Sequence, residues 1–251
     1  MSKRFIAYFD YLGFKDFIMN NPIEYQVQYI GHIFRDIENA LAKQQLKKAS
    51  PGLMVPNLQN SKLHCINFSD TVLFYTNDDS LDSLKEILEV ADIFNWQCID
   101  FFFPVRGCLY YGECVDRRFN TKTGNTGTYS VNSLIGTGLI NAYLKAENQS
   151  WAGTVIDDTV VQYIAANFGN PNSILSPHAK MYIVPYKEKP EKQADEWVFN
   201  LVKVNGKLND VAFGNMEKSI IENFGKHNKG TDSPRVKEII GNTINFLKSY
   251  T

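Results

Sequence analysis

The sequence is poor in the residues that hold zinc or build a disulfide framework. It has four cysteines and four histidines in 251 residues. The cysteines are Cys65, Cys98, Cys108 and Cys114, and no two of them form a Cys-x-x-Cys pair. His64 and Cys65 are adjacent, so in a strand their side chains would point to opposite faces. We therefore expect neither a zinc site nor structural disulfides, and we expect a protein of a reducing compartment.

The sequence also lacks long apolar runs and an excess of charge of one sign. The formal net charge is −1, which gives no reason to expect nonspecific binding to nucleic acid or to a membrane surface. No apolar run approaches the roughly 20 residues of a membrane span, and residues 1–5 begin a strand rather than a signal peptide. We therefore expect a soluble, cytoplasmic protein without a nucleic-acid or membrane partner, in which a charged substrate would need a local basic site.

What the sequence does contain is a pair of short segments that each place one aspartate at the end of a strand-like run. Residues 3–9 are mostly apolar and lead to Asp10, and residues 63–75 form two strand-like runs broken at Ser69 and Asp70. A carboxylate at a strand end that meets a second at a hairpin tip can hold hard cations against a phosphate, as two-metal phosphoryl or nucleotidyl transfer requires. The alternative is two merely solvated aspartates, since turns favour this residue.

The hydrophobic pattern predicts an α/β fold with the element order β-α-β-β-α-β, followed by a helix and a strand. The predicted elements are a strand at 3–11, a helix at 22–48, strands around Ser69-Asp70 within 63–75, a helix at 79–103, a strand at 105–111, a helix at 133–147, a strand at 154–157 and a helix at 159–166. We interpret residues 51–61 as a loop and 116–129 as a basic connection rich in Gly, Thr and Asn. The order is typical of a ferredoxin-like palm.

The last third of the chain has a different pattern. Two strands, at 180–185 and 197–204, flank a charged loop at 187–195. Two helices follow, at 214–224 and 234–250. We predict a catalytic domain over residues 1–170 and a C-terminal β/α extension over 171–251 that packs on the same domain, because the segment Gly169-Asn-Pro-Asn-Ser breaks the pattern. The residues of the extension suggest no chemistry.

Four segments resemble the class III nucleotide cyclase family, and most closely the bacterial pyrimidine cyclases of the Pycsar antiphage systems. Residues 9–15 resemble the first metal motif, and residues 68–71 resemble the second at the hairpin tip. Val105-Arg106-Gly107 with Gly112 resembles the Arg/Gly strand, and residues 136–147 resemble the helix that borders the nucleotide pocket. The four occur in the family's order over about residues 5–157.

This resemblance implies an activity and an assembly. Such enzymes convert a nucleoside triphosphate to its 3′,5′-cyclic monophosphate and pyrophosphate, as head-to-tail homodimers with active sites shared across the interface. The family's metal ligands fall on Asp10, Asp70 and the main-chain carbonyl of Tyr11. The cofactors would be two ions, Mn²⁺ or Mg²⁺, which carboxylates suit better than zinc. The cyclic product would signal to a separate effector protein in antiphage defence.

The resemblance also assigns residues to substrate binding. Gly13 and Phe14 match the segment whose backbone N–H groups hold the triphosphate. Independently of the resemblance, Arg106, Lys145 and Lys15 are candidate cations for the charge that develops on the leaving oxygen, with Arg106 as a catalytic residue or, alternatively, a contact to the base. Each also has a plainer interpretation: Lys15 as a helix-start charge, Arg106 as an edge-strand residue paired with a surface carboxylate, and Lys145 as a solvated side chain.

Base recognition departs from that of the purine cyclases. Their polar residue four positions before the second metal aspartate is replaced here by Ile66, with Phe68 on the same strand face. Phe68 is a candidate for stacking on the base or, alternatively, a core residue. Asn141 and Lys145 are the nearest polar candidates on the third helix. We therefore expect UTP, or CTP, as substrate. The alternatives are another palm-type nucleotidyltransferase that makes oligo- or dinucleotides, and a catalytically silent nucleotide-binding homologue.

Overall fold

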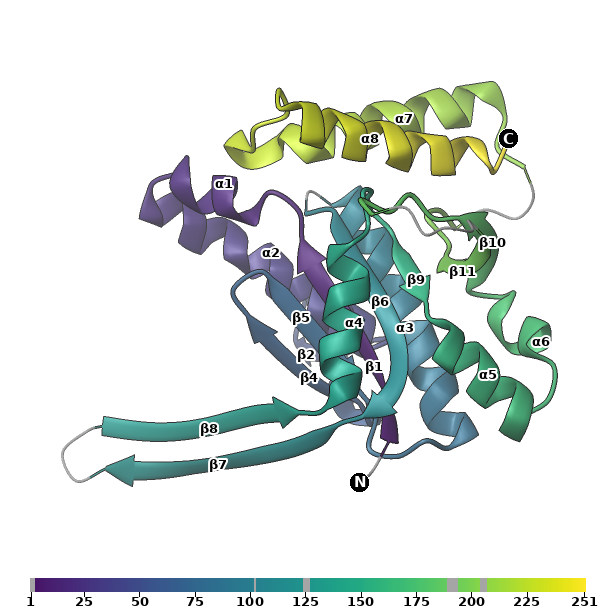
Figure 1. The fold of residues 1–251 in the computed structure, drawn as a ribbon. Coiled ribbons are helices and arrows are strands. Elements are labelled where there is room, and N and C mark those ends of the chain that lie inside the picture. Colours follow the sequence, from purple (N-terminus) through teal and green to yellow (C-terminus); the bar gives the residue numbers. More distant parts are fainter. Residues whose placement is uncertain (1–2, 102, 124–126, 189–193, 204–206) are drawn as a thin grey trace.

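A mixed β-sheet forms the centre of the computed structural model, which describes residues 3–101, 103–123, 127–188, 194–203 and 207–251 (Figure 1). Within these residues the sheet has seven strands. In spatial order they are β10 (Ala179–Ile183), β11 (Asp195–Phe199), β9 (Thr154–Ile156), β6 (Val105–Glu113), β1 (Lys3–Tyr11), β5 (Thr71–Tyr75) and β4 (His64–Phe68). All neighbours are antiparallel except β6 and β9, which are parallel.

The strands β6-β1-β5-β4 carry the ferredoxin-like order, with helices in the two crossovers. These helices are α1 (Phe14–Met19) and α2 (Ile23–Leu41) after β1, and α3 (Leu81–Asp100) after β5. Helix α4 (Thr137–Glu147) follows β6 and precedes β9. The predicted α/β palm, with its extension by further strands and helices, is therefore confirmed.

The alternation of side chains along β1 separates the two faces of the sheet. Phe5 and Phe9 pack in the core beneath α2 and α3. Ile6 and Tyr8 pack on the opposite face with buried residues of α4. Because successive strand residues point to opposite faces, Asp10 belongs to the α4 face. The apolar pattern of β1 thus decides on which side of the sheet the carboxylate lies.

Within the described residues, four further helices complete the fold. They are α5 (Asp158–Asn167), α6 (Pro171–Leu175), α7 (Asp210–Gly225) and α8 (Pro234–Lys248), with a short 3₁₀ turn, η2 (Lys226–Asn228), between α7 and α8. Figure 1 shows α7 and α8 side by side across the end of the sheet at which β1 leads into α1. A second core cluster joins these helices to β9 and β11. No helix in the described part of the chain has the length and apolar character needed to cross a bilayer.

The predicted helix at 22–48 is too long, and the loop at 51–61 is not wholly irregular. Helix α2 ends at Leu41, and Lys43 and Gln44 turn the chain with positive φ angles of 50° and 60°. A hairpin of β2 (Leu46–Ser50) and β3 (Leu53–Pro56) follows, before a 3₁₀ turn, η1 (Leu58–Asn60). The error arose because lysine and glutamine are good helix formers, whereas the pairing of β2 with β3 depends on a turn at Gly52 with φ of 80°.

The predicted basic connection at 116–129 is wrong, since its described residues belong to the two paired strands of a long β-hairpin, and residues 124–126 lie outside the described residues. Strands β7 (Val115–Thr123) and β8 (Gly127–Ile135) pair in register, and Phe119 contacts Tyr129 across them. In Figure 1 this hairpin, here called the arm, projects away from the sheet. The Gly, Thr and Asn content suggested a loop, but threonine and valine also favour strands. Helix α4 therefore begins at Thr137 rather than at 133.

The remaining differences concern one short helix, the ends of two strands and the boundary near residue 170. The short helix α6 was not predicted, and the strands predicted at 180–185 and 197–204 are shifted to Ala179–Ile183 and Asp195–Phe199. Of the predicted charged loop, residues 189–193 lie outside the described residues. The predicted boundary near residue 170 does not divide the chain into two separate sheets, because β10 and β11 extend the sheet that contains β1. The division into 1–170 and 171–251 stays a prediction.

Helix α2 carries a buried carboxylate, Asp36, whose ionisation should affect the stability of the fold. Burial raises the pKa of Asp36 to about 6, although the neighbouring Arg35 opposes the shift. The folded state therefore binds a proton that the unfolded state has released, so stability should fall as pH rises from about 4 to 6. The free energy of unfolding of the wild-type protein should fall by on the order of 2 kcal/mol across this range, and Asp36→Asn should remove this fall. Urea unfolding at pH 4 and pH 6.5 measures the difference, and parallel pH profiles for the two proteins would contradict it.

Candidate functional site

Asp10 and Asp70 line one cavity, of about 270 Å³. Asp10 lies near the end of β1, opposite Thr71 of β5. Asp70 lies in the tight turn between β4 and β5, where Ser69 has a φ of 55°. The backbone N–H of Tyr11 donates to the carbonyl oxygen of Asp70 at 2.9 Å, which fixes the strand end against the turn. The two aspartates therefore come together as the sequence predicted.

Arg106 faces Asp10 across the sheet. The two residues are register partners on the adjacent central strands β6 and β1, so their side chains share a face. The guanidinium donates from Nε to Asp10 Oδ2 at 3.0 Å, and its Nη2 lies 2.9 Å from the same oxygen. Nη2 also pairs with Glu147 at the end of α4. Arg106 is thus a buried residue of a central strand, and the edge-strand alternative is wrong.

The electrostatics of Asp10 favour a nearby cation. Burial raises the pKa of the Asp10 carboxyl above its ordinary value. Arg106 opposes this shift, and the like charge of Asp70 adds to it. A carboxylate desolvated beside a second carboxylate is stabilised by positive charge between them.

The donor set fits a hard divalent cation. Among the described residues no group of three or more His, Cys, Asp or Glu side chains could hold a metal ion by itself. Mg²⁺, however, commonly binds through one or two carboxylates together with substrate phosphates and water. Asp10 and Asp70 supply two carboxylates in one cavity, and the main-chain carbonyl of Tyr11 is adjacent. The residues present therefore fit Mg²⁺ or Mn²⁺ and offer no soft ligand for zinc.

The segment that follows β1 forms the next wall of this cavity. Gly13, Phe14 and Lys15 all line it. Gly13 has a φ of 78°, a conformation that glycine adopts without strain. The rings of Phe14 and Tyr11 are buried in the core, so only their main chains are available to a ligand. Lys15 is exposed. The structure thus brings these predicted substrate-binding residues beside the two aspartates.

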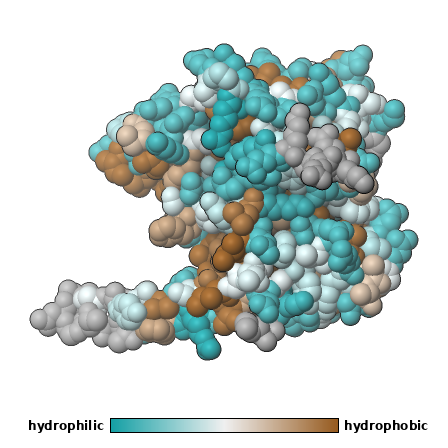
Figure 2. Space-filling view, viewed as in Figure 1, coloured by the Kyte–Doolittle hydropathy of each residue, from teal (hydrophilic) through white to brown (hydrophobic). Residues whose placement is uncertain are grey.

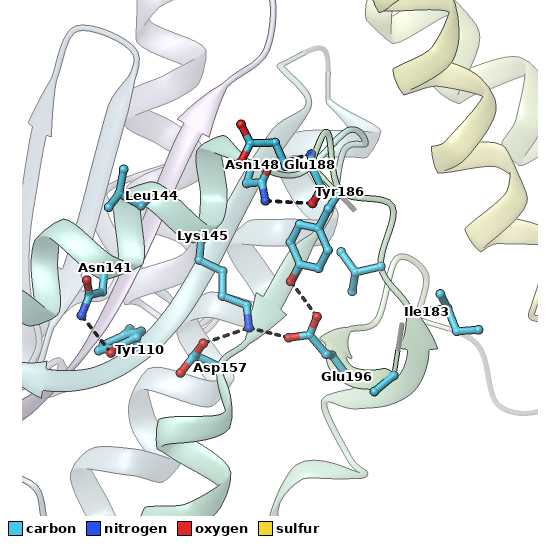
Figure 3. A pocket seen from close by; sticks show the side chains of 12 residues that line it. Tyr110, Asn141, Leu144, Lys145, Asn148, Asp157, Ile183, Tyr186, Glu188 and Glu196 are labelled. Carbon is cyan, nitrogen blue, oxygen red and sulfur yellow. Dashed lines mark hydrogen bonds and ion pairs between the residues drawn. The ribbon is translucent and has the colours of Figure 1, made fainter. Parts of the chain in front are cut away.

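Lys145 lies in a different cavity. This larger cavity, of about 610 Å³, lies between α4 and the β9–β11 side of the sheet. Figure 3 shows Lys145 between Asp157 and Glu196, with its Nζ 2.9 Å from Asp157 Oδ2. Burial alone would lower the pKa of Lys145, but the two carboxylates raise it above its ordinary value. The lysine is therefore a fixed, paired cation rather than a freely solvated one, and its predicted role in substrate binding stays a prediction.

The residues considered for base recognition do not line the cavity of Asp10 and Asp70. Phe68 ends β4 with 79% of its surface exposed and does not line the cavity of Asp10 and Asp70. It is therefore not a core residue. Ile66 is half-buried and packs against the core cluster on the α4 face. Asn141 lines the cavity of Lys145 and donates to the hydroxyl of Tyr110 (Figure 3).

Sequence reasoning missed several charged residues near Asp10 and Asp70. Glu147 pairs with Arg106 and also with Lys187. Lys229 and Arg235, from the segment between α7 and α8 and the start of α8, line the cavity itself. Glu147 is the last residue of α4 and of the segment 136–147 that resembles the family's pocket helix, so the sequence offered a signal for it. The C-terminal cations carry no local signal, because only the packing of α7 and α8 brings them to this place.

Comparisons with known proteins identify the fold. No known family model matches the chain, and no curated protein matches its sequence. The guanylate cyclase domain of RhGC from Catenaria anguillulae, solved with GTP, aligns with a TM-score of 0.51 at 13% identity, over 80% of this chain and 98% of that one. The catalytic core of a rhodopsin-guanylyl cyclase with converted specificity, solved with ATPαS, aligns with a TM-score of 0.50 at 14% identity, over 79% and 95%. The chain therefore has the fold of class III nucleotide cyclase catalytic domains.

Proposed function

We propose that this protein is a class III nucleotide cyclase that converts a pyrimidine nucleoside triphosphate, UTP or CTP, to its 3′,5′-cyclic monophosphate and pyrophosphate. The observation that carries the proposal is the convergence of Asp10 and Asp70 in one cavity with basic residues and the Gly13 turn. In this fold, such a pair of carboxylates is suited to holding divalent cations against a triphosphate. The structural likeness to nucleotide-bound cyclase domains supports the same proposal.

The proposed reaction is an in-line displacement within the substrate. The 3′-oxygen forms a bond to the α-phosphorus, the bond from this phosphorus to the bridging oxygen breaks, and the hydroxyl proton passes to solvent. When bound, two Mg²⁺ or Mn²⁺ ions lower the pKa of the 3′-hydroxyl and neutralise the phosphates. Asp10 and Asp70 would hold these ions, with the main-chain carbonyl of Tyr11. Arg106 holds Asp10 in place through its two contacts with Oδ2, and the backbone around Gly13 and Phe14 receives the phosphates.

A pyrimidine substrate follows from the apolar character of the position at which purine cyclases carry a polar residue. Ile66 packs into the α4-face core and presents no hydrogen-bonding group. A purine-selective site needs buried polar groups that pair with the base edge, because discrimination comes from leaving such groups unpaired with the wrong base. We favour UTP over CTP on the resemblance to the uridylate cyclases. Phe68, exposed at the end of β4, is available for stacking on a base.

The active form would be a head-to-tail homodimer with shared active sites. Two features support this. The exposed face of α4 carries Ile140 and Leu144, and Ile135 at the base of the arm continues it. Figure 2 shows this apolar surface over α4 and toward the arm. Such a surface is suited to burial against a second copy. Lys145 and Asn141 would then meet the nucleotide held by the partner's aspartates, which explains why they line a separate cavity within one chain.

The cyclic nucleotide would act as a second messenger. The resemblance to Pycsar cyclases implies a role in antiphage defence, in which the product binds a separate effector protein. A freely diffusing product needs no contact between the two proteins.

Product analysis tests the proposed function. We expect the purified protein with Mn²⁺ to convert UTP or CTP, but neither ATP nor GTP, to a cyclic monophosphate and pyrophosphate, as read by mass spectrometry. Chelation of the metal should abolish turnover, because two carboxylates alone cannot neutralise a triphosphate. A linear or cyclic oligonucleotide would instead indicate another palm-type nucleotidyltransferase. Tight nucleotide binding without product would indicate a catalytically silent homologue.

A further inference from the structure

The C-terminal segment forms one wall of the cavity that contains Asp10 and Asp70. Its contribution consists of Phe224, Lys229, Gly230, Arg235, Val236 and Ile239. Two of the five side chains in this set are cationic, and none is acidic. The same cavity is also lined by carboxylates, Asp10 and Asp70 among them. A polyanion together with divalent cations is the kind of ligand that matches a cavity lined by both carboxylates and cations.

Hydrogen bonds to α1 and to the two residues that follow it hold this segment in place. Asn20 and Asn21 donate from Nδ2 to the carbonyl oxygens of Asn228 and His227, each at 2.8 Å. The backbone N–H of Gly230 donates to Asp16 Oδ2 at 3.2 Å. His227 and Asn228 have positive φ angles of 62° and 57°. Backbone strain of this kind persists where the surroundings over-determine the conformation, and it concentrates at functional sites.

The strained turn directs Lys229 over the segment that follows β1. A Cβ on Gly13 would lie 2.9 Å from Lys229 Cδ, so the lysine stem lies directly on the glycine. Lys229 Nζ lies 5.0 Å from the ring centroid of Phe103. The lysine is 5% exposed, and burial lowers its pKa to about 7. An anion bound in the adjoining cavity would offset this desolvation.

Arg235 is the second cation, and its position is open. It lies in the first turn of α8, is exposed, and makes no ion pair with any residue that the structure describes. The positive charge of Arg235 also affects a second basic residue near the site, Lys187. Together with burial and Arg106, it lowers the pKa of Lys187 to about 8. Arg106 differs from it, because Asp10 and Glu147 already occupy its guanidinium.

We propose that Lys229 and Arg235 bind the β- and γ-phosphates of the nucleoside triphosphate, so that the C-terminal helical hairpin, formed by α7, η2 and α8, is part of the active site. This inference rests on the proposed function for the identity of the ligand. The guanidinium group of Arg235 can donate two parallel hydrogen bonds to a phosphate at the rim of the cavity. Lys229 supplies a point charge above Gly13, whose backbone faces the same space. The hairpin thereby links phosphate binding to the fold of the last third of the chain.

The test uses the full-length protein, inorganic tripolyphosphate as the probe, and two variants with matched controls. Lys229→Met keeps the apolar part of the side chain over Gly13 and removes the charge. Arg235→Gln removes the guanidinium group and its charge. Lys237→Met, at an exposed position of α8 outside the cavity, and Arg117→Gln, at an exposed position of the arm, are the controls. Titration calorimetry with Mg²⁺ measures the dissociation constant, and steady-state kinetics with UTP or CTP separates KM from kcat.

Each cavity variant should weaken tripolyphosphate binding roughly 10- to 100-fold, the effect of losing one charge-assisted hydrogen bond. KM should rise, and both controls should behave as wild type. If both Arg235→Gln and Lys229→Met bound tripolyphosphate and UTP or CTP as wild type does, the inference would be overturned. Arg235 is exposed, so its substitution should leave the fold intact. Cyclisation by the wild-type protein would still uphold the proposed function in that case. Conversely, tripolyphosphate binding that depends on both residues, in a protein that makes no cyclic product, would support the inference and refute the function.

Discussion

Asp70→Ala should yield a folded protein with at least about 10³-fold lower cyclase activity, equivalent to about 4 kcal/mol of transition-state stabilisation. Asp70 is one of the two carboxylates proposed to hold the divalent cations, and alanine leaves Asp10 without its partner. The fold should survive, because the side chain of Asp70 makes no hydrogen bond with any described residue. What anchors the turn is its carbonyl oxygen, which accepts from Tyr11 N, and alanine keeps that group.

The control for this variant is Asp82→Ala, which removes an exposed carboxylate from the first turn of α3, outside the cavity. Its activity should equal that of wild type. Product formation at saturating Mn²⁺ and UTP or CTP, with circular dichroism for folding, checks both variants. Near-normal cyclisation by Asp70→Ala would show that the metal assignment is wrong, whatever the activity of Asp82→Ala.

Trp151→Ala should have the largest effect on stability. The indole is fully buried where the end of α4, β10 and α8 meet. It stacks on Tyr182 with ring centroids 5.5 Å apart and meets Phe246 edge-on at 4.9 Å. Its Nε1 donates to Gln149 Oε1 at 2.7 Å. Removing such a side chain leaves a large cavity and costs about 3–5 kcal/mol, a large fraction of the 5–15 kcal/mol typical of a folded protein.

Thermal unfolding checks this prediction, with a fall in Tm of roughly 10 °C expected for a chain of this size. Met19→Ala is the control, because that side chain is 73% exposed. Its change should stay within about 0.5 kcal/mol. A Tm for Trp151→Ala within a degree or two of wild type would mean that the helical hairpin contributes little to the stability of the sheet.

The central palm could be predicted from the sequence because its signals are local. The apolar run of residues 3–9 forms β1, and the helical periodicity after Ser80 forms α3 with that serine as its N-cap. The break at Ser69 and Asp70 is the turn of the β4–β5 hairpin. Each of these signals lies within a window of a few residues, where side-chain alternation, helical spacing and turn chemistry operate. The placement of Asp10 near Asp70 then followed from strand order.

The sequence signals for the arm were ambiguous. Residues 116–129 combine turn-forming glycine and asparagine with β-branched threonine, and the two tendencies predict different structures. The long register between β7 and β8 decided in favour of the hairpin. The end of α2 was missed for a similar reason, since pairing of β2 with β3 outweighs the helix propensity of residues 43–48.

The sequence by itself determined the ferredoxin-like order of the palm and the pairing of Asp10 with Asp70, because both depend on patterns a few residues long. Only the tertiary structure decided the partners of those aspartates. Arg106 meets Glu147 through the packing of α4 on β6, and Lys229 covers Gly13 through the docking of the turn before α8 on α1. Contacts between residues so distant in sequence exist only once register, helix packing and burial are fixed together, and no local window of the chain encodes them.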